Sequence, residues 1–329
     1  MSTVPKAPAK FSGPLAAVLQ GLVAEKRGAG YRYDATAGDL LHLDRFCVAV
    51  GHHETSLPRE LVCRWTAKQA HETETTRQHR ISLIRIVGEY MQRCGYPAYV
   101  YPRHTGSRTP PRYIPYIFSR AELARLFTSI DACGPDRASP QRHRVLPMLF
   151  RLLYGCGLRV SEALALRMGD VDLAVGTIHI RDAKFGKERI VPLHPSLVGR
   201  FREYLPTSPA LTDPDQSVFP SPQGSAYAAS TIYVYFRRFL WAAGISHGGR
   251  GRGPRLHDLR HTFAVHCLQR WVAGGVDLSI ALPYLSAYLG HTGLKGTQDY
   301  LRLTAELHPH IIAAMERRFG AILPGGSPL

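Results

Sequence analysis

The sequence predicts a mainly α-helical protein of two domains that contains one small antiparallel β-sheet. Three observations support this fold class. Most of the chain repeats apolar residues at intervals of three and four positions, which is the period of an amphipathic helix. Two short runs rich in β-branched residues, TIHI and RIVPL, enclose the compact segment AKFGKE, which is typical of a β-hairpin. A stretch rich in proline, arginine and glycine interrupts the helical pattern, and a length of 329 residues suits two domains.

The N-terminal part of the sequence is expected to be helical throughout. Residues 1–10 are polar and contain prolines, so we expect a disordered tail there. Residues 11–103 form the first predicted domain, whose amphipathic segments end at glycines. In the segment DATAGDLLHLDRFCVAVG, Asp34 is the expected N-cap of a helix and Gly51 follows its end.

A linker is predicted at residues 104–115. It lies within the stretch YPAYVYPRHTGSRTPPRYIP, which has no helical period. Arginines in or beside the linker either follow a phosphate backbone or form a solvated hinge, and the sequence does not decide between these two roles. These candidates for DNA binding are Arg103, Arg108 and Arg112.

The second predicted domain covers residues 116–305. Ser119 and Glu122 have the spacing of a capping box, in which each side chain bonds to the backbone N–H of the other residue. A helix is therefore expected to begin there, followed by a buried helix in the apolar segment HRVLPMLFRLLYG, the hairpin and three more helical segments. Residues 306–329 form a C-terminal tail with an apolar stripe on a short helix. The stripe consists of Ile311, Ile312, Met315 and Phe319.

The charge balance of the chain favours a polyanionic partner. Lysine and arginine number 41 against 25 aspartate and glutamate residues, which gives a formal net charge of +16. Each phosphate that a basic side chain neutralises releases condensed counterions, so nucleic acid is the favoured partner. A surplus of charge that serves solubility is the alternative.

Cysteine usage and hydropathy argue against several other classes of protein. The six cysteines form no C-x-x-C pair, which argues against a zinc site or a redox motif. The start of the chain lacks the apolar core of a signal peptide, and no run of about 18 apolar residues predicts a membrane span. We therefore expect a reduced, cytoplasmic protein.

Arg159 and Glu162 are the first candidates for chemistry. In GCGLRVSEALAL, Arg159 lies where a glycine turn meets a helix, so its guanidinium and the N–H groups of the first turn would both favour an anion. Glu162 is three residues later on the same helix face and can hold the arginine in place. A surface ion pair also explains this segment, and from the segment alone it is the preferred interpretation.

The segment HDLRHTFAVH places His257 and Arg260 on one face of a helix. Because both side chains can be cationic, this pairing is unfavourable unless an anion lies between them. The preceding glycine-rich loop, HGGRGRGPR, either approaches a phosphate or is an ordinary surface loop. Its basic residues are Arg250, Arg252 and Arg255.

Two lysines and a tyrosine complete the candidates. Lys184 and Lys187 flank the tip of the hairpin, where a lysine can donate a proton to a leaving oxygen, although most turn lysines have no such role. In LGHTGLKGTQDYLRL, Tyr300 follows His291 by nine residues and is either a reactive group or an aromatic residue at the start of a helix. Three other tyrosines lie in apolar helical runs and are interpreted as core residues: Tyr154, Tyr284 and Tyr288.

Taken together, these motifs resemble those of the tyrosine recombinases, also called the phage integrase family. GCGLRVSEALALRMGDVDL resembles the first arginine box of the family, and AKFGKERIVPL resembles its lysine hairpin. HDLRHTFAVH is similar to the His-x-x-Arg box, and LGHTGLKGTQDYLRL resembles the histidine and nucleophile box with its nine-residue step. The resemblance runs from about residue 113 to about residue 305, and four motifs in this order are far more specific than any one of them. The first domain matches only in being helical, basic and of the expected size.

The resemblance implies a two-domain clamp around double-stranded DNA, made of a helical core-binding domain and a catalytic domain. It also implies that Tyr300 attacks the scissile phosphate and forms a 3′-phosphotyrosyl link. Arg159 and Arg260 would hold the non-bridging oxygens, where negative charge grows in the transition state. Glu162 would support Arg159 without reacting.

The resemblance further implies that Lys184 is the general acid for the departing 5′ oxygen. His257 would be the general acid/base partner, and His291 would hydrogen-bond or position the phosphate. The hairpin tip departs from the usual pattern, because the family often has a glycine after the first lysine, so Lys187 stays a second candidate for the acid. No metal and no other cofactor is expected, since two guanidiniums supply the charge that Mg²⁺ supplies in other phosphoryl-transfer enzymes.

The implied function is site-specific DNA recombination, namely integration or excision of a mobile element. The expected assembly is a homo- or hetero-tetramer on paired DNA sites, with or without co-encoded recombinases, at the nucleoid in the cytoplasm. The segment LPYLSAYLGH favours the transposon-associated integrases over the chromosome-dimer resolvases, and the C-terminal stripe packs either on a neighbouring protomer or on its own domain. Two alternatives are a type IB topoisomerase that relaxes supercoils as a monomer and a catalytically silent DNA-binding accessory protein.

Overall fold

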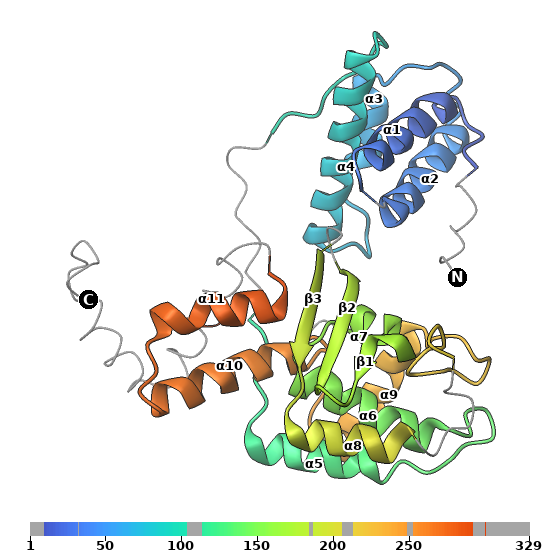
Figure 1. Ribbon diagram of the computed structural model, residues 1–329. Coiled ribbons are helices and arrows are strands. Elements are labelled where there is room, and N and C mark those ends of the chain that lie inside the picture. Colours follow the sequence, from blue (N-terminus) through green and yellow to red (C-terminus); the bar gives the residue numbers. More distant parts are fainter. Residues whose placement is uncertain are drawn as a thin grey trace. The chain divides into compact units, whose positions relative to one another are not determined.

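The fold is mainly α-helical with one three-stranded antiparallel sheet, which confirms the predicted fold class (Figure 1). The chain divides into two compact units, Met1–Tyr113 and Ile114–Leu329, and each has its own hydrophobic core. Across the described residues, no helix is both long and apolar enough to cross a lipid bilayer. The computed structural model describes residues 10–31, 33–103, 114–183, 187–205, 213–248, 253–291 and 300.

The described part of the first unit consists of helices whose apolar faces meet in one core. The long helix α4 (Glu74–Arg93) is capped by Thr73, whose hydroxyl accepts a hydrogen bond from the backbone N–H of Thr76 at 3.2 Å. The apolar spacing of the sequence therefore forms a helical bundle here, as expected. The helices are α1 (Ala16–Gly28), α2 (Asp34–Ala49), α3 (Arg59–Thr66) and α4 (Glu74–Arg93).

The start of α2 differs from the sequence-based prediction. Tyr33 is the N-cap, in the left-handed region at φ 55°, and Asp34 is the first helical residue. The carboxylate of Asp34 accepts a hydrogen bond from the Arg27 guanidinium at 2.7 Å and does not cap the helix. The predicted end is confirmed, because Gly51 follows the helix with φ 72°, a conformation that glycine adopts without strain.

The second unit begins with the predicted capping box. The N–H of Ser119 donates to Glu122 at 2.8 Å, and the N–H of Glu122 donates to the Ser119 hydroxyl at 3.2 Å. The elements that follow are α5 (Arg120–Asp131), α6 (Arg142–Gly155), α7 (Val160–Ala165), the 3₁₀ turn η1 (Met168–Asp170), β1 (Val171–Asp172), β2 (Thr177–Ala183), β3 (Lys187–Pro192), α8 (Pro195–Tyr204), α9 (Ala229–Ala242), α10 (Asp258–Ala273) and α11 (Leu278–Leu289).

Helix α6 forms the centre of this unit, as its apolar sequence predicts. It packs against α5, α8 and α10, and seven of its residues are buried. The ring of Phe150 on α6 stacks on Phe236 of α9, with centroids 6.0 Å apart. Because α6 leads directly into the glycine turn and α7, this core fixes the position of the first arginine motif.

The sheet has the order β1-β2-β3, and β2 and β3 form the predicted hairpin. Ile178 lies opposite Val191, and Ile180 lies opposite Arg189. Ile178, Ile180 and Val191 are buried, whereas Ile190, which lies between Arg189 and Val191 on β3, is 67% exposed. Since opposite residues in an antiparallel pair share a face, Arg189 lies on the buried face of the hairpin.

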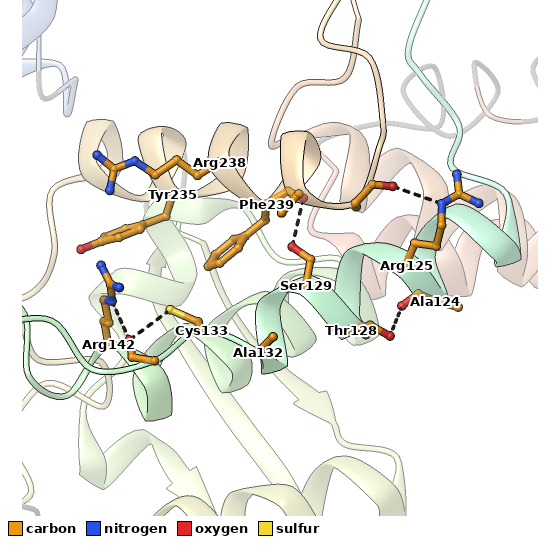
Figure 2. A pocket seen from close by; sticks show the side chains of 13 residues that line it. Ala124, Arg125, Thr128, Ser129, Ala132, Cys133, Arg142, Tyr235, Arg238 and Phe239 are labelled. Atoms are coloured by element: carbon orange, nitrogen blue, oxygen red, sulfur yellow. Dashed lines mark hydrogen bonds between the residues drawn. The ribbon is translucent and has the colours of Figure 1, made fainter.

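Side chains of α5 and α9 in the second unit line a groove of about 740 Å³ (Figure 2). Two side chains of α5 join the helices, because Ser129 donates to the Phe239 carbonyl at 3.0 Å and Arg125 donates to the Ala243 carbonyl at 3.1 Å. None of the site residues predicted from the sequence lines this groove. The groove is therefore separate from the predicted chemistry.

Candidate active site

Arg159 is held by its own helix at the start of α7. The preceding Gly157 has φ 58°, and a side chain there would meet the Phe263 ring at 2.6 Å, so the turn requires glycine. The guanidinium of Arg159 donates to Glu162 Oε1 at 2.6 Å, and its backbone N–H donates to Glu162 Oε2 at 2.9 Å. Glu162 thus fixes both the backbone and the side chain of Arg159.

The Glu162 carboxylate is buried and binds a second arginine. Arg189 of β3 donates two parallel hydrogen bonds to it, at 3.1 and 2.9 Å, and Arg260 lies 3.9 Å away. Burial alone would raise the pKa of Glu162, but hydrogen bonds from Arg189 and from the Arg159 backbone, together with the charge of Arg189, lower it to about 2. The interpretation as a surface ion pair is wrong, because the Glu162 side chain is only 4% exposed.

Arg260 on α10 is the most deeply buried charge of the site. It is 1% exposed and donates to the Gly157 carbonyl at 2.8 Å and to the Leu289 carbonyl at 2.6 Å. Burial and the neighbouring charge of Arg159 lower its pKa to about 10, so the guanidinium still carries its charge at neutral pH. The same contacts hold α10 against the glycine turn and the end of α11.

Three arginines converge on the C-terminal end of α11. The carbonyls of Tyr288 and Leu289 are the last two of the helix, lack partners within it and form the negative end of its dipole, and the carbonyl of Gly290 follows directly. Cationic side chains are therefore stabilised there, and they satisfy these carbonyls in turn. The bonds run from Arg189 Nε to the Tyr288 carbonyl (2.8 Å), from Arg260 Nη2 to the Leu289 carbonyl (2.6 Å) and from Arg159 Nη2 to the Gly290 carbonyl (3.5 Å).

His291 and Tyr300 stack beside this cluster. Gly290 ends α11 with φ 67°, and His291 follows directly. The ring centroids of His291 and Tyr300 are 5.8 Å apart with an interplanar angle of 29°, and Tyr300 is 3% exposed. The nine-residue step in the sequence thus brings a histidine and a buried tyrosine into contact.

A further histidine, His261, joins the site from α10. Its ring centroid is 4.8 Å from that of His257 and 5.4 Å from that of Tyr300, so the tyrosine ring contacts two imidazoles, those of His261 and His291. Its buried Nδ1 has no hydrogen-bond partner among the described atoms. The sequence reasoning missed His261, although its position four residues after His257 places both on one helix face.

The pKa values of all three histidines lie well below 7, so the imidazoles are neutral at neutral pH. Desolvation and the charges of Arg260 and Arg159 lower the pKa of His257 to about 4. Desolvation and the same two arginines lower the pKa of His291 to about 4. Burial, followed by the neighbouring His257 and Arg260, lowers the pKa of His261 to about 3. A bound anion would oppose these effects and raise each pKa.

The other predicted residues have different outcomes. Arg103 is exposed at 81% and lies 4.0 Å from Glu89, and the backbone N–H of Arg255 donates to Asp258 at 2.7 Å. The prediction that Tyr284 is a core residue is wrong, because it is 71% exposed on α11. Lys184, Arg108, Arg112, Arg250 and Arg252 lie outside the described residues, as does the side chain of Lys187.

Arg189 is the second residue that the sequence reasoning missed. The alternation of the hairpin contains the signal, since Arg189 and the apolar Val191 are two residues apart and share a face.

In the part of the chain that the structure describes, no group of three or more His, Cys, Asp or Glu side chains is placed to hold a metal ion.

The geometry describes an anion site beside a buried tyrosine. Three guanidiniums surround one carboxylate, which leaves two positive charges in excess. The imidazoles of His261 and His291 contact the tyrosine ring, and an imidazole can accept or donate a proton. Such an arrangement can bind a phosphate group and present a hydroxyl nucleophile to it.

Comparison with known proteins gives a consistent result. Residues 117–306 match the sequence profile of the phage integrase family. A protein named "Putative integrase/recombinase y4rB" from Sinorhizobium fredii is 29% identical over 306 residues, which cover 92% of this chain and 96% of that protein. Tyrosine recombinase XerD of Vibrio cholerae is 30% identical over 245 residues, which cover 74% of each chain. The solved Tn1549 transposon integrase, in complex with transposon right end DNA, shares the fold with a TM-score of 0.62 at 15% identity, covering 92% of this chain and 99% of that one.

Proposed function

Because the chain belongs to the phage integrase family and is a tyrosine-type site-specific recombinase, we propose that it cuts and rejoins double-stranded DNA through Tyr300. The observation that carries this proposal is the contact of a buried tyrosine with two imidazoles beside a cluster of three arginines. A phosphodiester needs both parts: positive charge for its non-bridging oxygens and a nucleophile in line with the leaving oxygen.

The proposed reaction conserves the phosphodiester. The Tyr300 oxygen loses its proton and forms a bond to phosphorus, while the bond from phosphorus to the 5′ oxygen breaks and that oxygen takes up a proton. The DNA is then held by a 3′-phosphotyrosyl link. Attack by a 5′ hydroxyl reverses the step, and because no bond energy is lost to hydrolysis, rejoining needs no ATP.

The residues of the site receive the following roles. Arg159 and Arg260 bind the non-bridging oxygens and stabilise the charge that develops on them. His257 acts as the general acid/base partner, and its lowered pKa leaves the imidazole neutral and able to accept a proton. His291 positions the phosphate, and Glu162 orients Arg159 through the hydrogen bonds described above.

The acid that protonates the 5′ oxygen is assigned to the hairpin tip. Lys184 is our choice, and Lys187 is the alternative at the start of β3. Both lysines lie in the sequence at the junction between the paired strands β2 and β3, and a lysine has a long side chain. Both lysines should be tested separately, because their sequence positions alone do not distinguish them.

The biological setting is proposed from composition and from relatives. The net charge of +16 and the exposed Arg103 support DNA binding, with residues 11–103 as core-binding domain, 104–115 as linker, 116–305 as catalytic domain and 306–329 as tail. The match to a transposon integrase fold and to an integrase/recombinase supports the integration or excision of a mobile element. We further propose a tetramer on paired DNA sites, acting at the nucleoid in the cytoplasm.

A covalent trapping experiment tests this function. The substrate is DNA from the ends of the element that carries the gene, with a nick close to the cleavage point. After attack, the short fragment that carries the new 5′ hydroxyl diffuses away, and the protein stays attached to the DNA. Wild-type protein should form a covalent adduct, and Tyr300→Phe should bind the same DNA without forming one. Tyr284→Phe is the matched control, because that tyrosine is exposed and lies outside the site, so it should form the adduct at the wild-type rate.

Three outcomes would refute the assignment. An adduct from Tyr300→Phe would place the nucleophile elsewhere. Binding without any adduct from wild-type protein would favour a silent accessory protein. Efficient relaxation of a plasmid that lacks the element ends would favour a topoisomerase.

A further inference from the structure

Arg189 is a largely enclosed arginine to which the proposed reaction assigns no role. We propose that Arg189 is a positioning residue of the cleavage site, which compensates the charge of Glu162 so that Arg159 and Arg260 keep their positive charge for the phosphate. This inference rests on the proposed function, since it concerns the same site. It adds a residue from strand β3 to the machinery.

The contacts of Arg189 are directed at protein acceptors. Its Nη1 and Nη2 donate to the two oxygens of Glu162 at 3.1 and 2.9 Å, and its Nε donates to the Tyr288 carbonyl at 2.8 Å. The side chain is only 11% exposed. Paired hydrogen bonds of this kind fix both the position and the orientation of a carboxylate. Arg189 therefore acts on the phosphate site through Glu162.

Charge compensation follows from the arrangement around Glu162. The same carboxylate binds Arg159 at 2.6 Å and lies 3.9 Å from Arg260, so it offsets part of the positive charge that a phosphate needs. With Arg189 present, the cluster has two positive charges in excess; without it, only one. Charges act strongly over such distances when water is excluded, so this difference reaches the bound phosphate. Glu162 can thus orient Arg159 without cancelling its charge.

Gly290, directly after α11, leaves room for the Arg189 guanidinium because it has no side chain. A side chain at Gly290 would lie 2.8 Å from Arg189 Nη1, which shows how closely the arginine approaches the backbone there. His291 comes directly after this glycine. Arg189 therefore connects the hairpin to the segment that carries His291, in addition to its bond with Glu162.

The test compares two DNA substrates that differ only in charge. One carries an ordinary scissile phosphodiester, and the other carries a methylphosphonate there, which has no negative charge. On the phosphodiester, Arg189→Gln should form the covalent adduct about 10- to 100-fold more slowly than wild type. Total DNA affinity and its salt dependence should change far less than the cleavage rate, because the Arg189 guanidinium is directed at Glu162 and the Tyr288 carbonyl and is not expected to bind the DNA backbone directly. On the methylphosphonate, the defect should shrink to within about threefold, since the extra positive charge no longer matters.

Two further variants keep the proposal open to refutation if Arg189→Gln is unstable. Arg189→Lys keeps the charge and should recover most of the phosphodiester rate. The double variant Glu162→Gln/Arg189→Gln removes both charges and should cleave faster than Arg189→Gln. Arg181→Gln is the matched control, because Arg181 belongs to the same sheet but is exposed and pairs with Asp170 at 2.5 Å. It should cleave both substrates at the wild-type rate.

An equal defect of Arg189→Gln on both substrates would overturn the proposal, because it would assign Arg189 a purely structural role. So would a double variant that is no faster than Arg189→Gln. Failure of wild-type protein to form any adduct would instead refute the proposed function, so the two failures are distinguishable.

Discussion

The buried imidazole of His261 makes the stability of the second unit depend on pH. A histidine in an unfolded chain has a pKa of about 6.5, whereas burial and the charges around it lower the pKa of His261 to about 3 in the folded protein. As the pH falls, the unfolded chain therefore takes up a proton before the folded protein does. The contribution of His261 to the free energy of unfolding is therefore fully present above about pH 6.5. It is lost progressively as the pH falls from there toward the folded pKa of about 3.

The size of this effect follows from the difference between the two pKa values. One pKa unit corresponds to about 1.4 kcal/mol. At pH 5 the unfolded pKa lies about 1.5 units above the solution pH, so the contribution of His261 falls by about 2 kcal/mol relative to pH 7. His257 and His291 act in the same direction, because their pKa values are also lowered.

The assay is urea unfolding of wild type and His261→Phe at pH 7 and pH 5, at constant ionic strength. Phenylalanine fills the same space against Tyr300 and cannot titrate. The free energy of unfolding should decrease on acidification in both proteins, but by about 2 kcal/mol less in His261→Phe. Equal decreases in the two proteins would refute the reasoning, because His261 would then titrate alike in both states.

The remaining predictions concern the arginine cluster. Glu162→Gln should lower the free energy of unfolding by about 3–5 kcal/mol, because it leaves Arg189 buried without its charged partner; a loss below about 1 kcal/mol in urea unfolding would contradict this. Gly290→Ala should cost about 1–3 kcal/mol by the same measurement, since it combines a φ of 67° with a contact of 2.8 Å to the Arg189 guanidinium. A short DNA duplex that contains the cleavage site should raise the pKa of His257 from about 4 toward its usual value in an NMR titration, and an unchanged pKa would place the phosphate away from Arg260 and Arg159.

Local patterns of the sequence predicted the elements that depend on local interactions. The capping box at Ser119 formed because both partners lie within one helical turn. The hairpin formed between β-branched runs whose pairing needs only a short turn. The predicted N-cap at Asp34 is wrong by one residue, because Tyr33 takes the N-cap position and the Asp34 carboxylate binds Arg27 of α1. The position of Arg27 depends on how α1 lies beside α2, which a local pattern does not contain.

The family motifs predicted which residues carry the chemistry but not how these residues are supported. Glu162 looked like a surface partner of Arg159 because α7 alone gives no reason for burial. It is buried because β3 and the end of α11, both far along the chain, close over it. Arg189 was overlooked for the same reason: its importance follows from the hairpin register, which places it opposite the buried Ile180.

Arg260 and Arg159 are held with different firmness, and this difference suits them to different roles in the site. Arg260 is 1% exposed and makes two short bonds to backbone carbonyls, so it belongs to the rigid frame that exists before DNA binds. The Arg159 side chain is 24% exposed, and its bond to the Gly290 carbonyl is long at 3.5 Å. Arg159 can therefore turn donors toward a phosphate at small cost while Glu162 keeps its position. A site built this way has most of its charge in place in advance, which is the condition under which electrostatic stabilisation of a transition state is most effective.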